Sequence, residues 1–426
     1  MTRPIFRLAA TAAIALAAAT PALAETVVIH AGAVIADASG NPSGPATITV
    51  TDGRIVSIVD GFQPTPDGAT MVHLPDYTVL PGLIDLHVHL TGDPGGDFWK
   101  EATEPDEWGV VVGAKNARLT ALAGFTTVRE AGSAQQTAFV LRRGIAEGLM
   151  PGPRIVAAGP ALAIVGGHGD TNGFRPEVNE LLDTGFTCTG AVECAAKVRL
   201  ASQNGSDIIK ITATGGVLSQ QGRGLEAHFT AEEMKAIADT AHSLGLKVMA
   251  HAHGARGIEA AARAGIDTVD HGTYIDKAAA DAMIANGTVL VPTLMAFQGI
   301  SERLGKGIYT PVVEEKVRAV AETAKVFMGR AHKWGVKIAF GTDAGVFDHG
   351  RNAQEFALMV GQGMSNREAL ASATTVAAEV LGMENEIGKL APGYSADIIA
   401  VKGNPLDNVR VLEDVDWVMV RGRVVE

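Results

Sequence analysis

The sequence predicts an α/β fold, and three features carry this prediction. Short apolar segments alternate with helix-like segments through the middle of the chain, which is typical of a parallel sheet. Both ends of the chain instead have the alternating pattern of antiparallel strands. The 426 residues are 47% hydrophobic and include 50 glycines, as expected for a large core with many tight turns. We therefore expect a (β/α)8 TIM-type barrel with a small composite β-sandwich domain formed by both chain ends.

The first 24 residues have the features of a secretory signal peptide. Arg3 and Arg7 precede an apolar run over 8–19, and Ala-Leu-Ala at 22–24 supplies a cleavage site. A membrane anchor is the alternative, but the run is shorter than the roughly 20 residues that a span needs. We expect cleavage near Ala24 and an exported protein, either periplasmic or secreted.

The two terminal segments, 25–80 and 391–426, are predicted to form the β-sandwich together. Asp52-Gly53 between two alternating runs is a strong hairpin signal. Neither segment is long enough to bury a face alone, so we expect the two to pack together. The strand-like runs are 26–30, 46–50, 54–58, 69–74, 396–401 and 416–425.

The segment between them, 81–390, is predicted to be the barrel. A doubly wound open sheet is the alternative, but no Gly-x-Gly-x-x-Gly turn follows the first strand. The expected strands are 83–89, 125–129, 155–158, 207–212, 246–251, 268–271, 288–292 and 336–340. The expected helices include 113–123, 191–204, 230–244, 255–264, 311–334 and 367–381.

Polar residues that suit a metal ion fall at the carboxyl ends of these strands. Residues i and i+2 of a strand point the same way, so His87 and His89 can face one ion. In a (β/α)8 barrel the carboxyl ends of the strands form the active site. Half-buried histidines with structural partners are the alternative for any one of these positions. The predicted metal ligands are His87, His89, Lys210, His251, His271 and Asp343.

This set of side chains predicts metal-assisted hydrolysis. Imidazole and carboxylate groups bind zinc or a similar divalent cation. An ammonium has no lone pair, so Lys210 fits only if CO2 carboxylates its amine to a carbamate that bridges two ions; a core lysine paired to Asp207 or another carboxylate is the alternative. Two divalent ions, for which Zn2+ is our first choice, lower the pKa of a shared water to about 7. Asp343 is then placed to move a proton from this water to a leaving nitrogen, which predicts cleavage of an amide or related bond.

Charge and cysteine content limit the partners. The formal net charge is −12 and becomes more negative without the arginines of the leader, so we expect no nucleic-acid or membrane partner. We do expect a homo-oligomer. The two cysteines, Cys188 and Cys194, form either a disulfide, which an oxidising compartment permits, or two buried thiols.

Several motifs together resemble the amidohydrolase superfamily. They are PGLIDLHVH (81–89), IIKI (208–211), His251, VDHG (269–272), GTDAG (341–345) and GKLAPGYSAD (388–397), in this order. The resemblance implies that three ligands bind the more buried metal, one bridges and two bind the second metal. These are, in that order, His87, His89 and Asp343, then carboxylated Lys210, then His251 and His271.

Two further motifs resemble one branch of that superfamily. KITATGGV (210–217) and GGHGD (166–170) are similar to prolidase-like dipeptidases, which release the C-terminal residue of Xaa-Arg, Xaa-Lys or Xaa-Pro dipeptides and of N-acyl amino acids. His251-Ala252-His253 departs from that pattern and resembles ochratoxin-hydrolysing amidases. The implied substrate is a small amide with a free carboxylate.

Four residues have open roles. His253 shares a strand face with His251, so it either donates to the substrate carbonyl or orients a ligand. His168 is a second candidate contact for an oxyanion or carboxylate. Arg129 and Arg223 either pair with a substrate carboxylate or form structural salt bridges. We take Asp343, His253 and His168 as the candidate catalytic residues.

Two other functions compete with linear amide hydrolysis. One is hydrolysis of a cyclic amide, as in imidazolonepropionase-like relatives. The other is a non-catalytic binding protein on the same fold, for which loss of metal ligands is the expected sign. None of the six expected ligands is missing here, which favours an enzyme.

Overall fold

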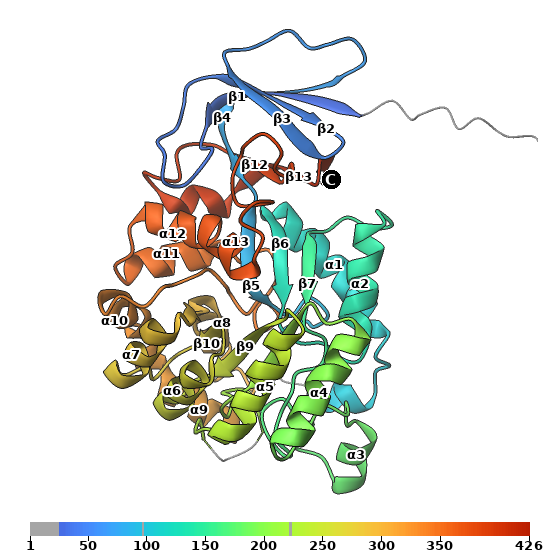
Figure 1. Ribbon diagram of the computed structural model, residues 1–426, viewed down its shortest axis with the longest axis vertical. Helices are drawn as coiled ribbons and strands as arrows, with labels where there is room; N and C mark the ends of the chain where they lie inside the picture. Colours follow the sequence, from blue (N-terminus) through green and yellow to red (C-terminus); the bar gives the residue numbers. More distant parts are fainter. Residues whose placement is uncertain (1–24, 96–97, 221–223) are drawn as a thin grey trace, which may run out of the picture.

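The computed structural model describes residues 25–95, 98–220 and 224–426. The expected signal peptide lies outside these residues. Figure 1 shows a β domain made from both chain ends, set against a larger body in which strands are surrounded by helices. Among the described residues, no helix is both long enough and apolar enough to cross a membrane.

The two chain ends join in one seven-stranded sheet. Its order is β14-β13-β12-β4-β1-β2-β3, with β1 parallel to β4 and β12 antiparallel to β4. The predicted hairpin is present, because Asp52 (φ 48°) and Gly53 (φ 74°) make the turn between β2 and β3. The strands are β1 Thr26–Val34, β2 Ala46–Thr51, β3 Arg54–Asp60, β4 Thr70–Pro81, β12 Ile398–Val401, β13 Val415–Val420 and β14 Arg423–Val424.

The barrel consists of two parallel sheets joined by isolated bridges. One sheet has the order β5-β6-β7 and the other β11-β10-β9-β8. Parallel bridges Leu162–Ile211, Leu290–Ile338 and Val88–Ala344 connect their edges. The strands are β5 Leu83–Val88, β6 Phe125–Glu130, β7 Arg154–Ala157, β8 Ile208–Thr212, β9 Lys247–Ala252, β10 Thr268–His271 and β11 Val289–Val291.

The prediction of a regular eighth strand over 336–340 was wrong. Only Ile338 of this segment forms a β-bridge. The backbone N–H of Phe340 donates to the carbonyl of Ser372 instead of to a neighbouring strand, which interrupts the ladder. The segment still closes the barrel, because the N–H of Leu86 donates to the carbonyl of Phe340.

Helices cover the outside of the barrel strands. The predictions for α4 and α6 match the structure, and α5 begins at a capping box of Thr230 and Glu233. The helices are α1 Trp108–Leu122, α2 Thr137–Ala146, α3 Pro176–Leu181, α4 Ala191–Asn204, α5 Ala231–Ser243, α6 Ala255–Ala264, α7 Lys277–Asn286, α8 Leu294–Glu302, α9 Pro311–Ala324, α10 Phe327–Lys333, α11 Gln354–Gly361, α12 Asn366–Ser372 and α13 Thr375–Leu381, with short 3₁₀ turns at Phe98–Ala102 and Val409–Glu413.

Two helices that the sequence predicts as continuous are each divided. The expected helix over 311–334 breaks at Val326 (φ −138°), between α9 and α10. The one over 367–381 breaks at Thr374 (φ −127°), whose hydroxyl donates to the carbonyl of Leu370. Threonine readily forms such local bonds, which compete with the helical ladder.

A disulfide links Cys188 and Cys194. The sequence left open whether these two residues form a disulfide or remain buried thiols. The segment before α4 pairs with 163, because the N–H of Cys188 donates to the carbonyl of Ala163. This pairing fixes the chain just before the glycine-rich loop that carries His168.

Candidate active site

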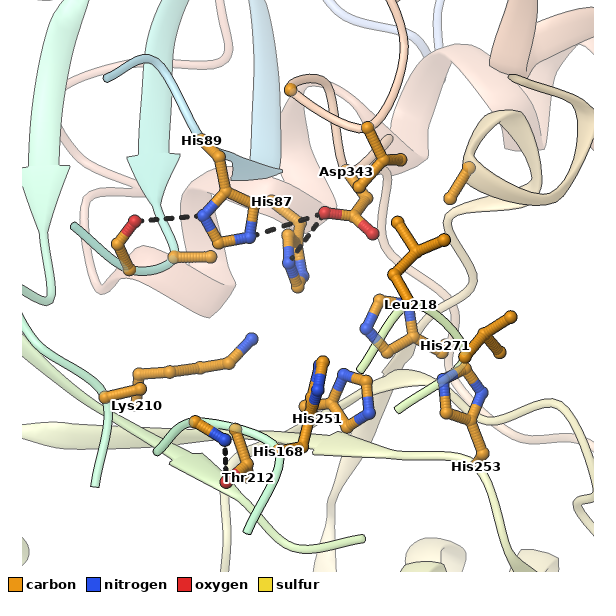
Figure 2. A pocket seen from close by; sticks show the side chains of 18 of the residues that line it. His87, His89, His168, Lys210, Thr212, Leu218, His251, His253, His271 and Asp343 are labelled. Atoms are coloured by element: carbon orange, nitrogen blue, oxygen red, sulfur yellow. Dashed lines mark hydrogen bonds and ion pairs between the residues drawn. The ribbon is translucent and has the colours of Figure 1, made fainter. Parts of the chain in front are cut away.

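A cavity of about 360 Å³ lies at the carboxyl ends of the barrel strands. All the predicted metal ligands and candidate catalytic residues line it, although their positions in the sequence extend from 87 to 343. Figure 2 shows their side chains converging on one space. The lining includes His87, His89, His168, Lys210, His251, His253, His271 and Asp343.

His87 and His89 point the same way from β5 and the residue after it, as the i+2 spacing predicts. The Nε2 atoms of both rings lie 3.4 Å from Oδ1 of Asp343. Their Nδ1 atoms face away from this oxygen: that of His87 bonds Asp270, and that of His89 lies 2.9 Å from the carbonyl of Gly132. Each ring is therefore fixed on one side and presents Nε2 to Asp343.

Three histidines form a second group, one each in β9 and β10 and one directly after β9. Ligand atoms of His251, His253 and His271 all lie within 4.8 Å of one another, and all three residues are buried. The Nδ1 atoms of His253 and His271 each lie 2.7 Å from a threonine hydroxyl, that of Thr273 and Thr293 respectively. These bonds leave the Nε2 atoms of both rings available to bind a metal ion or a substrate.

His271 belongs to both groups of potential ligands. With His87 and Asp343 it forms a set of ligand atoms within the same 4.8 Å limit. His251 is turned the other way from its neighbours, because its Nε2 lies 3.3 Å from the carbonyl of Gly215. His253, which the sequence analysis assigns to substrate contact, thus also has the position of a potential ligand.

Lys210 extends into the cavity from the middle of β8. Its Nζ lies 3.6 Å from Oδ2 of Asp270, so the carboxylate beside it is not Asp207 but another one, as the sequence analysis also allowed. Asp207 pairs with Arg142 on the outside of the barrel. Burial lowers the pKa of the Lys210 ammonium, which favours the neutral amine that can react with CO2.

Burial also sets the charge of the other groups. Desolvation, with a contribution from Lys210, lowers the pKa of His87 well below its usual value and that of His89 to about 4. The pKa values of His251 and His271 are lowered in the same direction, first by burial. The imidazoles are therefore neutral at pH 7, which is the form that binds metal. Desolvation raises the pKa of Asp343 to about 7.

Two of these residues have a backbone conformation that side chains rarely adopt. His271 (φ 72°) and Asp343 (φ 62°) are both left-handed, at a cost of about 1–3 kcal/mol each. The N–H of Asp343 donates to the carbonyl of His87 at 2.7 Å, which holds the strained turn against β5. Such strain is concentrated at functional sites, where the unusual backbone conformation orients a side chain toward the site.

A buried carboxylate that the sequence analysis missed supports this turn. Asp85 accepts hydrogen bonds from the N–H of His87 at 3.0 Å, from the N–H and hydroxyl of Thr342 at 3.1 and 2.6 Å, and from the amide of Asn352 at 2.8 Å. Its position two residues before His87, on the same face of β5, was the available signal. Asp85 connects the start of the His-x-His segment to the residue before Asp343.

Arg129 is a structural residue and does not line the cavity. It is fully buried, and its guanidinium donates to Asp270, Thr268 and the carbonyl of Leu86. This outcome agrees with the structural salt bridge, which is one of the two roles that the sequence analysis gave for Arg129. Arg223 lies outside the described residues.

His168 lies against the second histidine group. Its ring centroid is 4.3 Å from that of His251, and its Nδ1 is buried without a hydrogen-bond partner among the described residues. Only glycine fits at 216, because a Cβ there would lie 2.2 Å from the His168 ring. The close approach of this loop therefore fixes the ring beside the cavity.

The donor set fits divalent metal ions. Neutral imidazoles, one carboxylate and an amine with a lowered pKa converge in a buried space, and most of the rings have one nitrogen already occupied by a protein partner. Fixing one nitrogen in this way orients the other for a metal.

Comparison with known proteins identifies the family. The model of the amidohydrolase family matches residues 78–425. This chain belongs to the amidohydrolase family. It is accordingly a hydrolase that acts on amide bonds, in a family whose members depend on metal ions.

Relatives of this amidohydrolase agree with the branch that the motifs indicate. Ochratoxinase of Aspergillus niger is 30% identical over 420 residues, covering 92% of this chain and 84% of that protein. A crystal structure of a Xaa-Pro dipeptidase with methionine in its active site is 38% identical with a TM-score of 0.88, covering 94% of this chain and 100% of the other. A prolidase complexed with N-methylphosphonate-L-proline is 31% identical with a TM-score of 0.86, covering 94% and 99%.

Proposed function

We propose that this amidohydrolase releases the C-terminal amino acid from dipeptides or N-acyl amino acids, including ochratoxin-like aryl amides. The observation that carries the proposal is the convergence of seven histidine, aspartate and lysine side chains on one cavity, from the ends of four strands and from the segment that closes the barrel. The relatives support the substrate class, since one is an ochratoxinase and others are prolidase-like dipeptidases.

We infer that two divalent ions, with Zn2+ our first choice, are held by His87, His89, Asp343, His251, His271 and a carboxylated Lys210. When bound, these ions would supply Lewis acidity and a water acidified to a pKa of about 7. The lowered pKa of Lys210 supports the carbamate, because only the neutral amine attacks CO2.

Asp343 is the proposed proton carrier. Its Oδ1 lies 3.4 Å from Nε2 of both His87 and His89, and burial raises the pKa of its carboxyl to about 7 in the metal-free protein. A carboxyl group in this position is a candidate both to accept and to donate a proton. It would take the proton of the attacking water and return it to the leaving nitrogen.

His253 and His168 are the proposed substrate contacts. If the hydroxyl of Thr273 donates to Nδ1 of His253, then Nε2 carries a proton that can bond the carbonyl oxygen as it gains charge. Nδ1 of His168 has no hydrogen-bond partner in the described part of the chain, is buried beside the same cavity and can serve a carboxylate or oxyanion.

A substrate library tests this proposal. Purified metal-loaded protein is incubated with dipeptides, N-acyl amino acids, aryl amides of phenylalanine and cyclic amides, and released amino acids are measured. We expect release of C-terminal residues from linear amides. Turnover restricted to cyclic amides would contradict the proposal, and so would turnover that persists in Asp343→Asn.

We also propose that the protein is exported. The leader motif and the disulfide support this, because disulfides persist in oxidising compartments. Fractionation of cells that express the full chain should recover a mature form beginning at Glu25 outside the cytoplasm. Cytoplasmic protein with an intact leader would contradict it.

A further inference from the structure

One wall of the cavity is apolar and is built separately from the metal-ligand set. The helix α8 contributes Ala296, Phe297 and Ile300, the loop after β8 contributes Val217 and Leu218, and Val346 follows Asp343. The wall begins next to the candidate substrate contacts, since the ring centroids of Phe297 and His253 are 6.2 Å apart.

Among the described residues that line the cavity, Lys210 and Asp343 are the charged ones, and both belong to the proposed metal site. No described lining residue on the apolar wall offers a counter-charge to a cationic or anionic side chain. A charged group placed against this wall would lose its hydration without compensation.

The wall lies beside the group proposed to protonate the leaving nitrogen. The N–H of Val346 donates to the carbonyl of Asp343 at 3.1 Å, and Leu218 lines the same cavity as Asp343 (Figure 2). With Asp343 in its proposed role, the part of a substrate that departs with the nitrogen would meet the apolar wall.

Each part of the wall is held by a polar residue outside it. Lys316 of α9 donates to the carbonyls of Gly216 and Ser219 at 2.8 and 2.5 Å, on either side of Val217 and Leu218. Glu355 accepts from the first two N–H groups of α8, and Arg303 donates to the carbonyl of Val346. A wall held in this way has a defined shape before substrate binds.

From these observations we propose that the wall is a specificity subsite for an uncharged, apolar side chain on the released amino acid. The inference rests on the proposed hydrolysis of linear amides and deepens it. It excludes the arginine and lysine substrates that the branch resemblance allows.

The test uses the metal-loaded protein and N-acetyl amino acids in pairs of similar shape. We expect kcat/KM for leucine to exceed that for asparagine by at least about 10-fold, and that for methionine to exceed lysine by about 100-fold. Leu218→Ala and Phe297→Ala should lower kcat/KM for leucine by about 10-fold more than for glycine, which has no side chain to reach the wall. Leu218→Asp should raise the ratio of lysine to methionine.

Two results separate the possible failures. Lysine or arginine substrates that match methionine would overturn the subsite and leave amide hydrolysis standing. If no linear amide is hydrolysed, the proposed function fails, and calorimetry with free amino acids still tests the wall: it predicts that L-methionine binds at least 10-fold more tightly than L-lysine or L-aspartate. Equal binding would overturn it.

Discussion

Nδ1 of His87 lies 2.9 Å from Oδ2 of Asp270, and both side chains are buried. Oδ1 of the same carboxylate accepts from Arg129 at 3.1 Å, and Nζ of Lys210 lies 3.6 Å from Oδ2. Since a carboxylate only accepts, the His87 proton sits on Nδ1 and leaves Nε2 free for a ligand. Asp270 therefore orients two predicted metal ligands, and Arg129 balances its charge.

Removing this carboxylate should weaken metal binding. We expect Asp270→Asn to lower metal affinity by roughly 10- to 100-fold, because partners of ligating histidines contribute about that much. Chelator competition on the purified protein measures the change. Unchanged affinity would show that His87 is oriented without Asp270.

Removing the arginine should instead destabilise the fold. Arg129→Met leaves the buried Asp270 without its guanidinium partner, and breaking a buried pair in this way costs about 3–5 kcal/mol. The matched control is Arg256→Met at the exposed pair with Glu226, which should leave the free energy of unfolding almost unchanged because solvent screens this pair. Urea unfolding of both variants provides the comparison, and equal losses would contradict the argument.

Lys210 should carry a carbamate when metal is bound. Protein reconstituted with metal and ¹³C-labelled bicarbonate should show a carbamate carbon signal in NMR, and Lys210→Met should lack it. The variant should also retain less metal than the wild type, because the bridging group is gone. A wild-type protein that binds metal without this signal would rule out the carbamate.

Lys316 is a positioning residue for the apolar wall, so its loss should affect substrate binding more than chemistry. For an N-acetyl-leucine substrate we expect Lys316→Met to raise KM by about 10-fold with a smaller change in kcat. Lys316→Arg should restore most of the loss, because arginine can also donate to the carbonyls of Gly216 and Ser219. A fall in kcat as large as the rise in KM would mean that Lys316 does not act through substrate binding alone.

Glu355 should make the metal-free protein less stable as the pH rises. Desolvation raises the pKa of this fully buried carboxyl from 4.5 to about 8, against the hydrogen bonds from Leu294 and Met295. Below pH 4.5 the Glu355 carboxyl is protonated in both the folded and the unfolded state, so its full contribution to the free energy of unfolding is present. Between pH 4.5 and 8 only the folded state holds it, and stability falls by up to about 1.4 kcal/mol per pH unit.

The difference between wild type and Glu355→Gln isolates this effect from other titrating groups. In urea unfolding with chelator present, the stability of wild type relative to the variant should decrease from pH 5 to pH 8. A constant or increasing difference would mean that Glu355 is ionised in the folded protein.

The convergence of the site could be predicted from the sequence, because the i+2 rule and the topology of a barrel are sufficient for it. The i+2 rule aims His87 and His89 together, and barrel topology brings the carboxyl ends of β8, β9 and β10 to the same place. The helix α8 was not predicted, because its apolar residues directly continue those of β11 and give no change of period. Because α8 was missing from the prediction, half of the apolar wall was missing as well.

The supporting network could not be predicted from the sequence. Arg129 and Asp270 are 141 positions apart and meet only across the barrel interior. The irregular eighth strand likewise includes a long-range bond that the sequence does not reveal, from the N–H of Phe340 to the carbonyl of Ser372. Local patterns carry no information about such pairs.

Metal analysis of the purified full-length protein tests the central claim most directly. We predict about two divalent ions per chain, loss of amide hydrolysis after chelation, and recovery when Zn2+ and bicarbonate are returned. Hydrolysis that continues in protein stripped of metal would contradict the account.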